Sequence, residues 1–250
     1  MPRFKIILIV CLLITAGGCH ETPGINNQKQ TVSNIKTDTI PVQVSQKENG
    51  YEQIAKAIGL QEVTQKQDGI VVKMMYATTQ NFTQTNLYGD FNKAYLLPMA
   101  AAKLKTASKI LQQKFPKLTI TIYDAARPVV VQQQLWDLAK IEPSKKHLYL
   151  SRPEQNSLHN YGAAVDVAIL DSTGQMLDFG SPYDFFGEAA QPQLEPKLLK
   201  QGVLNLKQIA NRKLLRSVMV QAGFTPIKTE WWHFNACTRA YAKQHYKLFQ

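Results

Sequence analysis

The sequence has few cysteines, few histidines and no long apolar segment, and each shortage excludes a class of protein. Its 250 residues include three cysteines, too few for a disulfide framework. The longest apolar run covers residues 6–16, which is too short to cross a bilayer as a helix. A disulfide-stabilised scaffold and a polytopic membrane protein are therefore excluded.

The charge is basic, but it is not concentrated in one place. The formal net charge is +11, which favours anionic surroundings such as nucleic acid, anionic lipid or cell-wall polymer. The basic residues are spread through the chain without a cluster at a nucleic-acid-binding motif, so we expect no nucleic-acid partner.

Residues 1–19 have the layout of an export signal. Arg3 and Lys5 precede an apolar stretch over 6–14, and small residues then lead to Cys19. A cysteine in this position also resembles a bacterial lipobox, in which the cysteine is lipidated. We expect export to the cell envelope or periplasm and a membrane tether through lipidated Cys19. Ordinary secretion and an uncleaved anchor are the alternatives.

The mature chain divides into two parts by composition. Residues 20–50 contain no aromatic residue and are rich in Gln, Asn, Thr and Lys, so they cannot bury enough apolar surface to fold. They are interpreted as a flexible tether. Residues 51–250 are interpreted as one domain that carries the function.

The hydrophobic pattern of this domain mixes helices and strands. Helical spacing predicts helices over 97–115, 128–140 and 206–222. Alternating or apolar runs predict extended segments over 118–122, 164–169 and 224–234. Residues 186–205 are expected to be mostly loop. Because the elements do not follow a regular βαβ order, they predict an α+β fold with a mainly antiparallel central sheet flanked by helices.

Two of the five histidines stand in unusual surroundings. His159 lies shortly before Asp166, and His233 ends the segment that Glu230 begins. Asp166 sits within an apolar strand, where a carboxylate is costly to bury unless it is paired or binds a metal. Catalytic zinc takes three protein ligands of these types and keeps one position open, so His159, Asp166 and His233 form a candidate zinc site.

Glu230 is the candidate general base for water at such a site. On a regular strand Glu230 and His233 would face opposite sides, so the segment must bend for both to reach one metal. Each residue alone also has a structural interpretation: a lone histidine is usually structural, and a glutamate can mark a strand end.

The spacing Ser157-x-His159-x-x-Gly162-x-Ala164-x-Asp166, followed by Glu230-x-x-His233, resembles the zinc D-alanyl-D-alanine dipeptidases of the VanX type. These belong with peptidoglycan D,D- and L,D-carboxypeptidases to a wider family with a hedgehog/D,D-peptidase-like fold. The segments that start at Tyr76, Tyr123 and Gly180 are also similar to segments of the dipeptidases. The resemblance covers most of residues 60–240.

The resemblance implies a role for each matching position. His159, Asp166 and His233 would hold one Zn²⁺, and Glu230 would be the catalytic base. Arg127 would stabilise the oxyanion, in keeping with a fixed positive charge where negative charge develops. The residues implied to bind the substrate termini are Asp184, Ser157 and Tyr76.

The implied activity is zinc-dependent hydrolysis of D-Ala-D-Ala to two D-alanines in the cell envelope, linked to peptidoglycan turnover. One alternative is a D,D- or L,D-carboxypeptidase that trims longer stem peptides, which predicts an open cleft. Another is a non-catalytic wall-binding lipoprotein, which the presence of all five catalytic positions disfavours.

Overall fold

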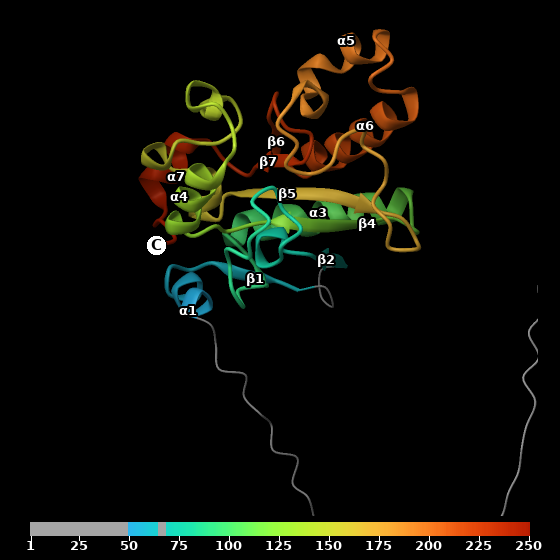
Figure 1. The fold of residues 1–250 in the computed structure, drawn as a ribbon. Coiled ribbons are helices and arrows are strands. Elements are labelled where there is room, and N and C mark those ends of the chain that lie inside the picture. The colour runs from blue at the N-terminus through green and yellow to red at the C-terminus, as the bar shows by residue number, and fades with distance from the viewer. Residues whose placement is uncertain (1–49, 65–68) are drawn as a thin grey trace, which may run out of the picture. The chain divides into compact units, whose positions relative to one another are not determined.

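The computed structural model describes residues 50–64 and 69–250 (Figure 1). The predicted signal, Cys19 and residues 20–49 of the predicted tether lie outside the described residues. Within the described part of the chain, no helix is long and apolar enough to cross a membrane.

A five-stranded sheet forms the centre of the fold. Its strand order is β2-β4-β5-β7-β6. These strands are β2 (Ile70–Val72), β4 (Thr119–Asp124), β5 (Ala164–Leu170), β7 (His233–Asn235) and β6 (Thr225–Pro226). Only β2 and β4 pair in parallel within this sheet, and the other neighbours are antiparallel. A separate antiparallel pair joins β1 (Gln61–Val63) and β3 (Ala94–Leu96).

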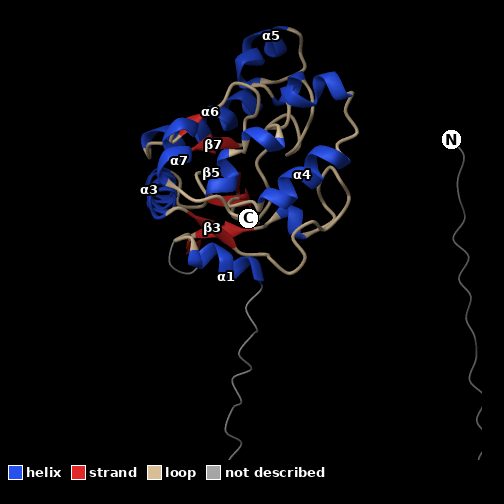
Figure 2. Ribbon diagram, turned by 90° about the vertical axis from the view of Figure 1, so that its left-hand side faces the viewer, coloured by secondary structure: helices blue, strands red, loops and turns tan. Residues whose placement is uncertain are grey.

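Helices surround this sheet (Figure 2). The α-helices are α1 (Gly50–Ala57), α3 (Pro98–Lys114), α4 (Val129–Leu138), α5 (Glu195–Lys200), α6 (Leu206–Gln221) and α7 (Arg239–His245). The helix α3 packs against β4 and α6, and α6 also contacts β6. The predicted α+β class with a mainly antiparallel sheet flanked by helices is therefore confirmed.

The long strands β4 and β5 hold the centre of the molecule. Every residue of β5 is buried, which explains its nearly continuous apolar sequence. Asp166 is the exception to that apolarity, and the strand register places it opposite both Asp124 of β4 and His233 of β7. Three polar side chains from segments far apart in the sequence thus form one row across the sheet.

Two of the expected segments differ from the structure. The predicted extended segment 224–234 is not continuous, because β6 ends at Pro226 and β7 begins at His233. Residues 186–205 were expected to be mostly loop, but they contain two 3₁₀ turns and α5. The helix α5 is only six residues long, so its sequence covers too few turns to show helical periodicity.

A buried arginine fixes the loop between β5 and α5. Arg212 of α6 donates hydrogen bonds to the carbonyls of Phe179 and Ala189, each at 2.6 Å. These two carbonyls flank Tyr183 and Asp184. The loop that carries these two residues is thereby held at both ends.

Candidate metal centre and active site

His159 lies on a short 3₁₀ turn, Leu158–Tyr161, directly before β5. The Ser157 hydroxyl caps this turn, and Gly162 ends it at φ 65°, a left-handed conformation that glycine adopts readily. His159 Nδ1 lies 2.7 Å from the Ala125 carbonyl oxygen. Because a carbonyl only accepts, Nδ1 carries the proton and the Nε2 lone pair is left to bind another group.

His233 is oriented in the same way from β7. Its Nε2 lies 2.7 Å from Asn235 Oδ1, an acceptor two residues along the strand. Nε2 therefore donates a proton, and Nδ1 points toward Asp166 Oδ1 at 3.0 Å. In each histidine, one ring nitrogen donates to a backbone or side-chain amide oxygen. The other ring nitrogen faces a common point beside Asp166 Oδ1.

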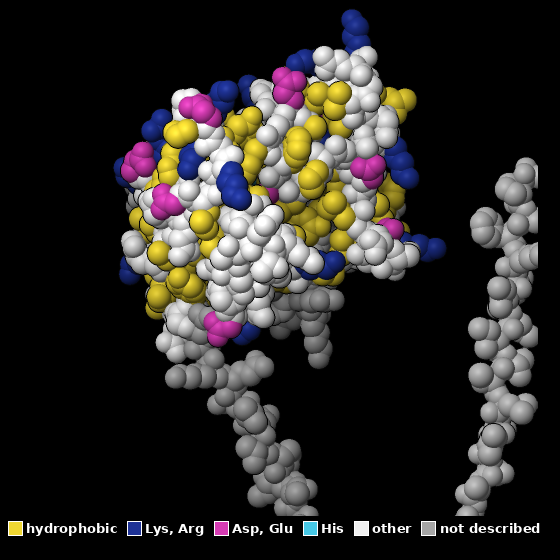
Figure 3. Space-filling model, viewed as in Figure 1, with side chains coloured by type: hydrophobic (Ala, Val, Ile, Leu, Met, Phe, Trp, Pro, Cys, Tyr) yellow, Lys and Arg dark blue, Asp and Glu magenta, His cyan; other side chains and the backbone are white. Residues whose placement is uncertain are grey.

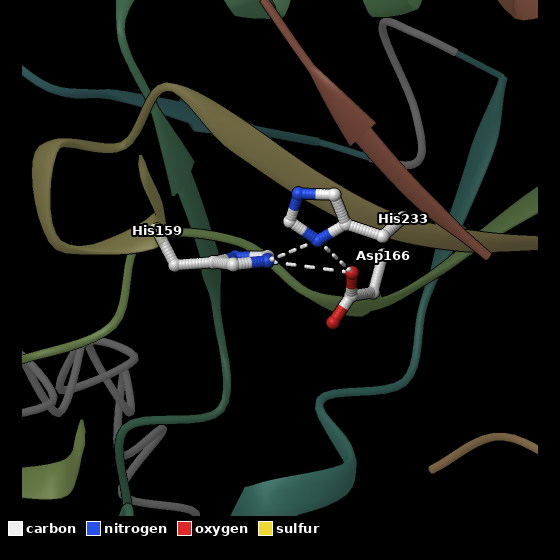
Figure 4. Close-up of side chains that lie close together, drawn as sticks. All are labelled: His159, Asp166 and His233. Carbon is white, nitrogen blue, oxygen red and sulfur yellow. Dashed lines mark hydrogen bonds and ion pairs between the residues drawn. The ribbon is translucent and has the colours of Figure 1, made fainter. Parts of the chain in front are cut away.

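Three ligand atoms converge at that place (Figure 4). His159 Nε2 lies 3.1 Å from His233 Nδ1 and 3.3 Å from Asp166 Oδ1. Atoms bound at about 2.0–2.1 Å to one tetrahedral ion lie roughly 3.3 Å apart. Two nitrogen lone pairs and a carboxylate oxygen at this spacing are a donor set for a divalent metal ion. The residues therefore fit a metal site.

The electrostatics of the cluster also favour a cation. Burial opposes ionisation of Asp166, but the two facing histidines outweigh it and hold the pKa of this carboxyl well below its usual range. Burial likewise lowers the pKa of His233, but the hydrogen bond and charge of Asp166 raise it overall. A proton on His233 Nδ1 would thus occupy the position that a metal needs.

Metal affinity should consequently depend on pH. Below its raised pKa His233 holds a proton that the metal must displace, so affinity for zinc as the probe ion should fall as pH falls. A chelator competition at about pH 8 and about pH 6 measures this, and the fall should approach roughly tenfold per pH unit below that pKa. A pH-independent affinity would contradict the ligand role of His233.

Asn235 should also affect the affinity of the site for zinc. Asn235→Ala removes the acceptor of His233 Nε2–H, and loss of such a partner typically costs about 10–100-fold in metal affinity. Asn235→Asp keeps an acceptor oxygen and should retain more of the affinity than the alanine variant. Equal zinc affinity for the wild type and Asn235→Ala would show that the amide does not orient the ligand.

Glu230 lies beside the metal ligands on the loop between β6 and β7. Its Oε2 is 3.9 Å from His233 Nδ1. The break in the sheet after Pro226 solves the geometric difficulty of a regular strand, because Glu230 is not part of either strand. Burial raises the pKa of Glu230 to about 7, with a further rise from Asp166. This carboxyl can therefore both take and give a proton near neutral pH.

Arg127 is held rigidly at the end of β4. It is only 6% exposed, and its Nε and Nη2 donate to Asp124 Oδ2 at 2.9 and 2.5 Å. Nη1 donates to Gln132 Oε1 at 2.8 Å, and Tyr88 completes the network by donating to Asp124 Oδ1. Burial disfavours the charge of Arg127, but Asp124 raises its pKa overall, so the guanidinium stays charged.

The three residues predicted to bind substrate lie around the same centre. Tyr76 donates a hydrogen bond to Asp184 Oδ2 at 2.9 Å, and its ring lies under the Arg127 guanidinium. Burial and the charge of Asp166 raise the pKa of Asp184 well above its usual value. Ser157 Oγ accepts from the His159 backbone N–H, so this serine supports the ligand turn as well as facing the pocket.

One pocket of about 150 Å³ contains all these side chains in its walls. The eight residues singled out from the sequence are Tyr76, Arg127, Ser157, His159, Asp166, Asp184, Glu230 and His233, and the structure brings all of them together. This pocket is smaller than the roughly 300–1,000 Å³ of pockets for drug-sized ligands. Its size suits a small polar molecule.

The structure adds three supporting side chains that the sequence analysis did not identify. Tyr183 donates to Asp166 Oδ2 at 3.1 Å, which leaves Oδ1 of that carboxylate to face the histidines. Asn235 and Gln132 orient His233 and Arg127. The role of Asn235 could have been predicted from the sequence, because Asn235 lies two residues after His233 and residues two apart on a strand share a face. Tyr183 and Gln132 have no such signal in the sequence.

Comparison with known proteins gives one consistent result. Residues 56–250 match the model of peptidase family M15, described as D-ala-D-ala dipeptidase. The D-alanyl-D-alanine dipeptidase of Escherichia coli K12 is 30% identical over 166 residues, which cover 65% of this chain and 77% of that relative. The D-alanyl-D-alanine dipeptidase of Synechocystis is 29% identical over 171 residues, 57% of this chain and 69% of that relative.

Proposed function

Because the chain belongs to the D-Ala-D-Ala dipeptidase family of metallopeptidases, we propose that it hydrolyses D-alanyl-D-alanine to two D-alanines with one zinc ion. The observation that carries this proposal is the convergence of three ligand atoms next to a carboxyl and a buried guanidinium in one small pocket. His159, Asp166 and His233 would hold the zinc.

The chain's own residues can carry the proton transfers. Zinc in this site would supply Lewis acidity, which polarises the scissile carbonyl and acidifies the attacking water. Glu230 takes the proton of that water and later gives it to the leaving amine. Burial raises the pKa of Glu230 and the nearby cationic groups lower it, so the carboxyl can exist in either protonation state during the two steps.

Arg127 places a positive charge where the reaction develops a negative charge. A tetrahedral intermediate carries an oxyanion, and a fixed cation beside it lowers the barrier without rearranging. The hydrogen bonds to Asp124 and Gln132 hold the guanidinium in place before the substrate arrives. Arg127 therefore acts through a preset position rather than through a movement.

Asp184 and Tyr76 suit the ammonium group of the dipeptide. The raised pKa of Asp184 means that this carboxyl resists ionisation until a cation is close. The substrate ammonium is such a cation, and Tyr76 already positions the carboxyl oxygen. The Ser157 hydroxyl is a candidate donor to the substrate carboxylate.

Aromatic side chains pack against one another in the wall of the pocket. Phe186 contacts Phe82 with ring centroids 4.8 Å apart and contacts Tyr149 at 5.6 Å. Three segments distant in sequence are thereby joined at the pocket, whose walls include Phe186 and Tyr149. This arrangement supports a dipeptidase rather than an open-cleft carboxypeptidase.

The signal-like segment supports a role outside the cytoplasm. We propose that the enzyme is exported and tethered by lipid on Cys19, where it would meet peptidoglycan or its released fragments. Recycling of wall peptides or recovery of D-alanine would then be the physiological role.

Cys19→Ser tests the tether in cells. Loss of the lipidated cysteine should move the protein from the membrane fraction to the soluble fraction, because one acyl-bearing residue would supply the anchor. Cys237→Ser, which alters a partly buried cysteine of the folded domain, is the matched control and should stay with the membranes. Membrane association of Cys19→Ser would instead favour an uncleaved anchor.

The activity itself is tested with residues 20–250. D-alanine release from D-Ala-D-Ala should stop when a chelator removes metal and return when zinc is added. L-Ala-L-Ala serves as the stereochemical control. A preparation that holds zinc but releases no D-alanine would overturn the proposed function.

A further inference from the structure

A second hollow adjoins the pocket that contains the metal ligands. It has a volume of about 280 Å³ and shares six wall residues with the first pocket: Tyr149, Leu150, Ser151, Ile227, Glu230 and Arg239. The two hollows therefore adjoin, with an inner part at the metal ligands and an outer part beyond Glu230. Asp184 and Tyr76 border the inner part alone.

The outer hollow has a cationic wall. Arg152 and Arg239 line it, and Glu230 is its only acidic wall residue among the described residues. The surrounding surface carries both basic and acidic side chains (Figure 3). Asp184 therefore borders only the inner pocket and Arg152 only the outer hollow, while Arg239 borders both.

Two arginines line the inner pocket, and the proposed reaction already uses Arg127 for the oxyanion. Arg127 is already engaged by Asp124 and Gln132. Within the described residues, the guanidinium of Arg239 makes no hydrogen bond or ion pair, and the residue is exposed. Arg152 lies 3.9 Å from Glu154 and lines the outer hollow alone.

The proposed reaction fixes which end of a dipeptide lies where. Asp184 binds the ammonium at the inner end, and Glu230 gives its proton to the leaving amine. The leaving residue therefore lies on the Glu230 side, toward the outer hollow, and its carboxylate needs a cation there. An arginine offers paired N–H donors that match a carboxylate.

We propose that Arg239 binds the carboxylate of the C-terminal residue of the substrate, with the outer hollow as the leaving-residue half of the site. This rests on the proposed function for the direction of the substrate. The proposal predicts that a substrate must have a free C-terminal carboxylate to bind tightly.

Binding to a catalytically inert enzyme tests this assignment without turnover. In the zinc-loaded Glu230→Gln background, calorimetry compares D-Ala-D-Ala with D-alanyl-D-alaninamide, which lacks the carboxylate charge. Adding Arg239→Ala should weaken dipeptide binding by roughly 10- to 100-fold, the usual effect of a hydrogen bond to a charged group, and leave amide binding unchanged. Arg239→Lys should restore part of the affinity.

Lys243→Ala is the matched control, because it removes an equal charge from the same helix at an exposed position outside both hollows. It should not alter the affinity for either ligand. Equal losses for the dipeptide and the amide, no loss for either, or failure of the dipeptide to bind would overturn the role of Arg239. A different result would separate the two proposals. If dipeptide binding depends on Arg239 but the wild-type protein shows no turnover, only the proposed function is overturned.

Discussion

Glu230→Gln is expected to lower turnover of D-Ala-D-Ala by about 10²–10⁴-fold, the range for loss of a general acid–base group, while zinc stays bound. The amide has nearly the shape of the carboxyl but cannot accept the proton of the attacking water. The metal should be retained because Glu230 lies 3.9 Å from His233 and is not one of the three converging ligands. Rates measured together with zinc content separate the two effects.

Glu188→Gln provides the control for this substitution. Glu188 is an exposed acid that pairs with Lys197 and lines neither hollow. Its removal should leave the rate unchanged. Turnover that survives in a zinc-loaded Glu230→Gln enzyme would place the general base elsewhere.

His159→Ala should abolish stable zinc binding and, with it, activity. A site with three protein ligands loses a third of its donors, and the remaining Asp166 and His233 would leave the ion largely open to water. Equilibrium dialysis followed by metal analysis measures the loss. Activity should return only slightly in excess zinc.

Folding must be followed in the same experiment, because His159 is only 2% exposed. Circular dichroism and a thermal unfolding curve report whether the variant keeps its structure. His245→Ala, at an exposed histidine on α7, is the matched control and should bind zinc normally. Unchanged zinc content in folded His159→Ala would contradict the ligand assignment.

The predictable parts of the fold are those with long, regular patterns. The stripe over 97–115 became α3, the alternation over 118–122 became β4, and the apolar run over 164–169 became β5. The candidate metal ligands were identifiable because an acid in a buried strand carries a desolvation cost that needs an explanation.

The sequence indicated that the segment containing Glu230 and His233 must bend, but it did not show where the break between β6 and β7 lies. A strand over 224–234 agrees with local composition, but Glu230 and His233 approach the same centre only because pairing stops at Pro226 and resumes at His233. This interruption depends on how β7 pairs with β5, through Asp166 opposite His233. Pairing between segments more than sixty residues apart leaves no local pattern to read.

The supporting contacts were also beyond sequence reasoning. The proton positions of His159 and His233 depend on the Ala125 carbonyl and the Asn235 amide. The outer hollow is formed by residues 147–155 together with 227–239, which are joined only by the fold. Such features arise from packing, so they become visible only once the elements are assembled.

The proposed function requires this pocket to cleave a free dipeptide. The most direct measurement compares D-alanine release from D-Ala-D-Ala with release from a pentapeptide that ends in D-Ala-D-Ala, using zinc-loaded residues 20–250. We expect rapid release from the dipeptide and little or none from the pentapeptide, because Asp184 would then face a peptide N–H in place of the substrate ammonium. Efficient release from the pentapeptide, or release from neither, would contradict it.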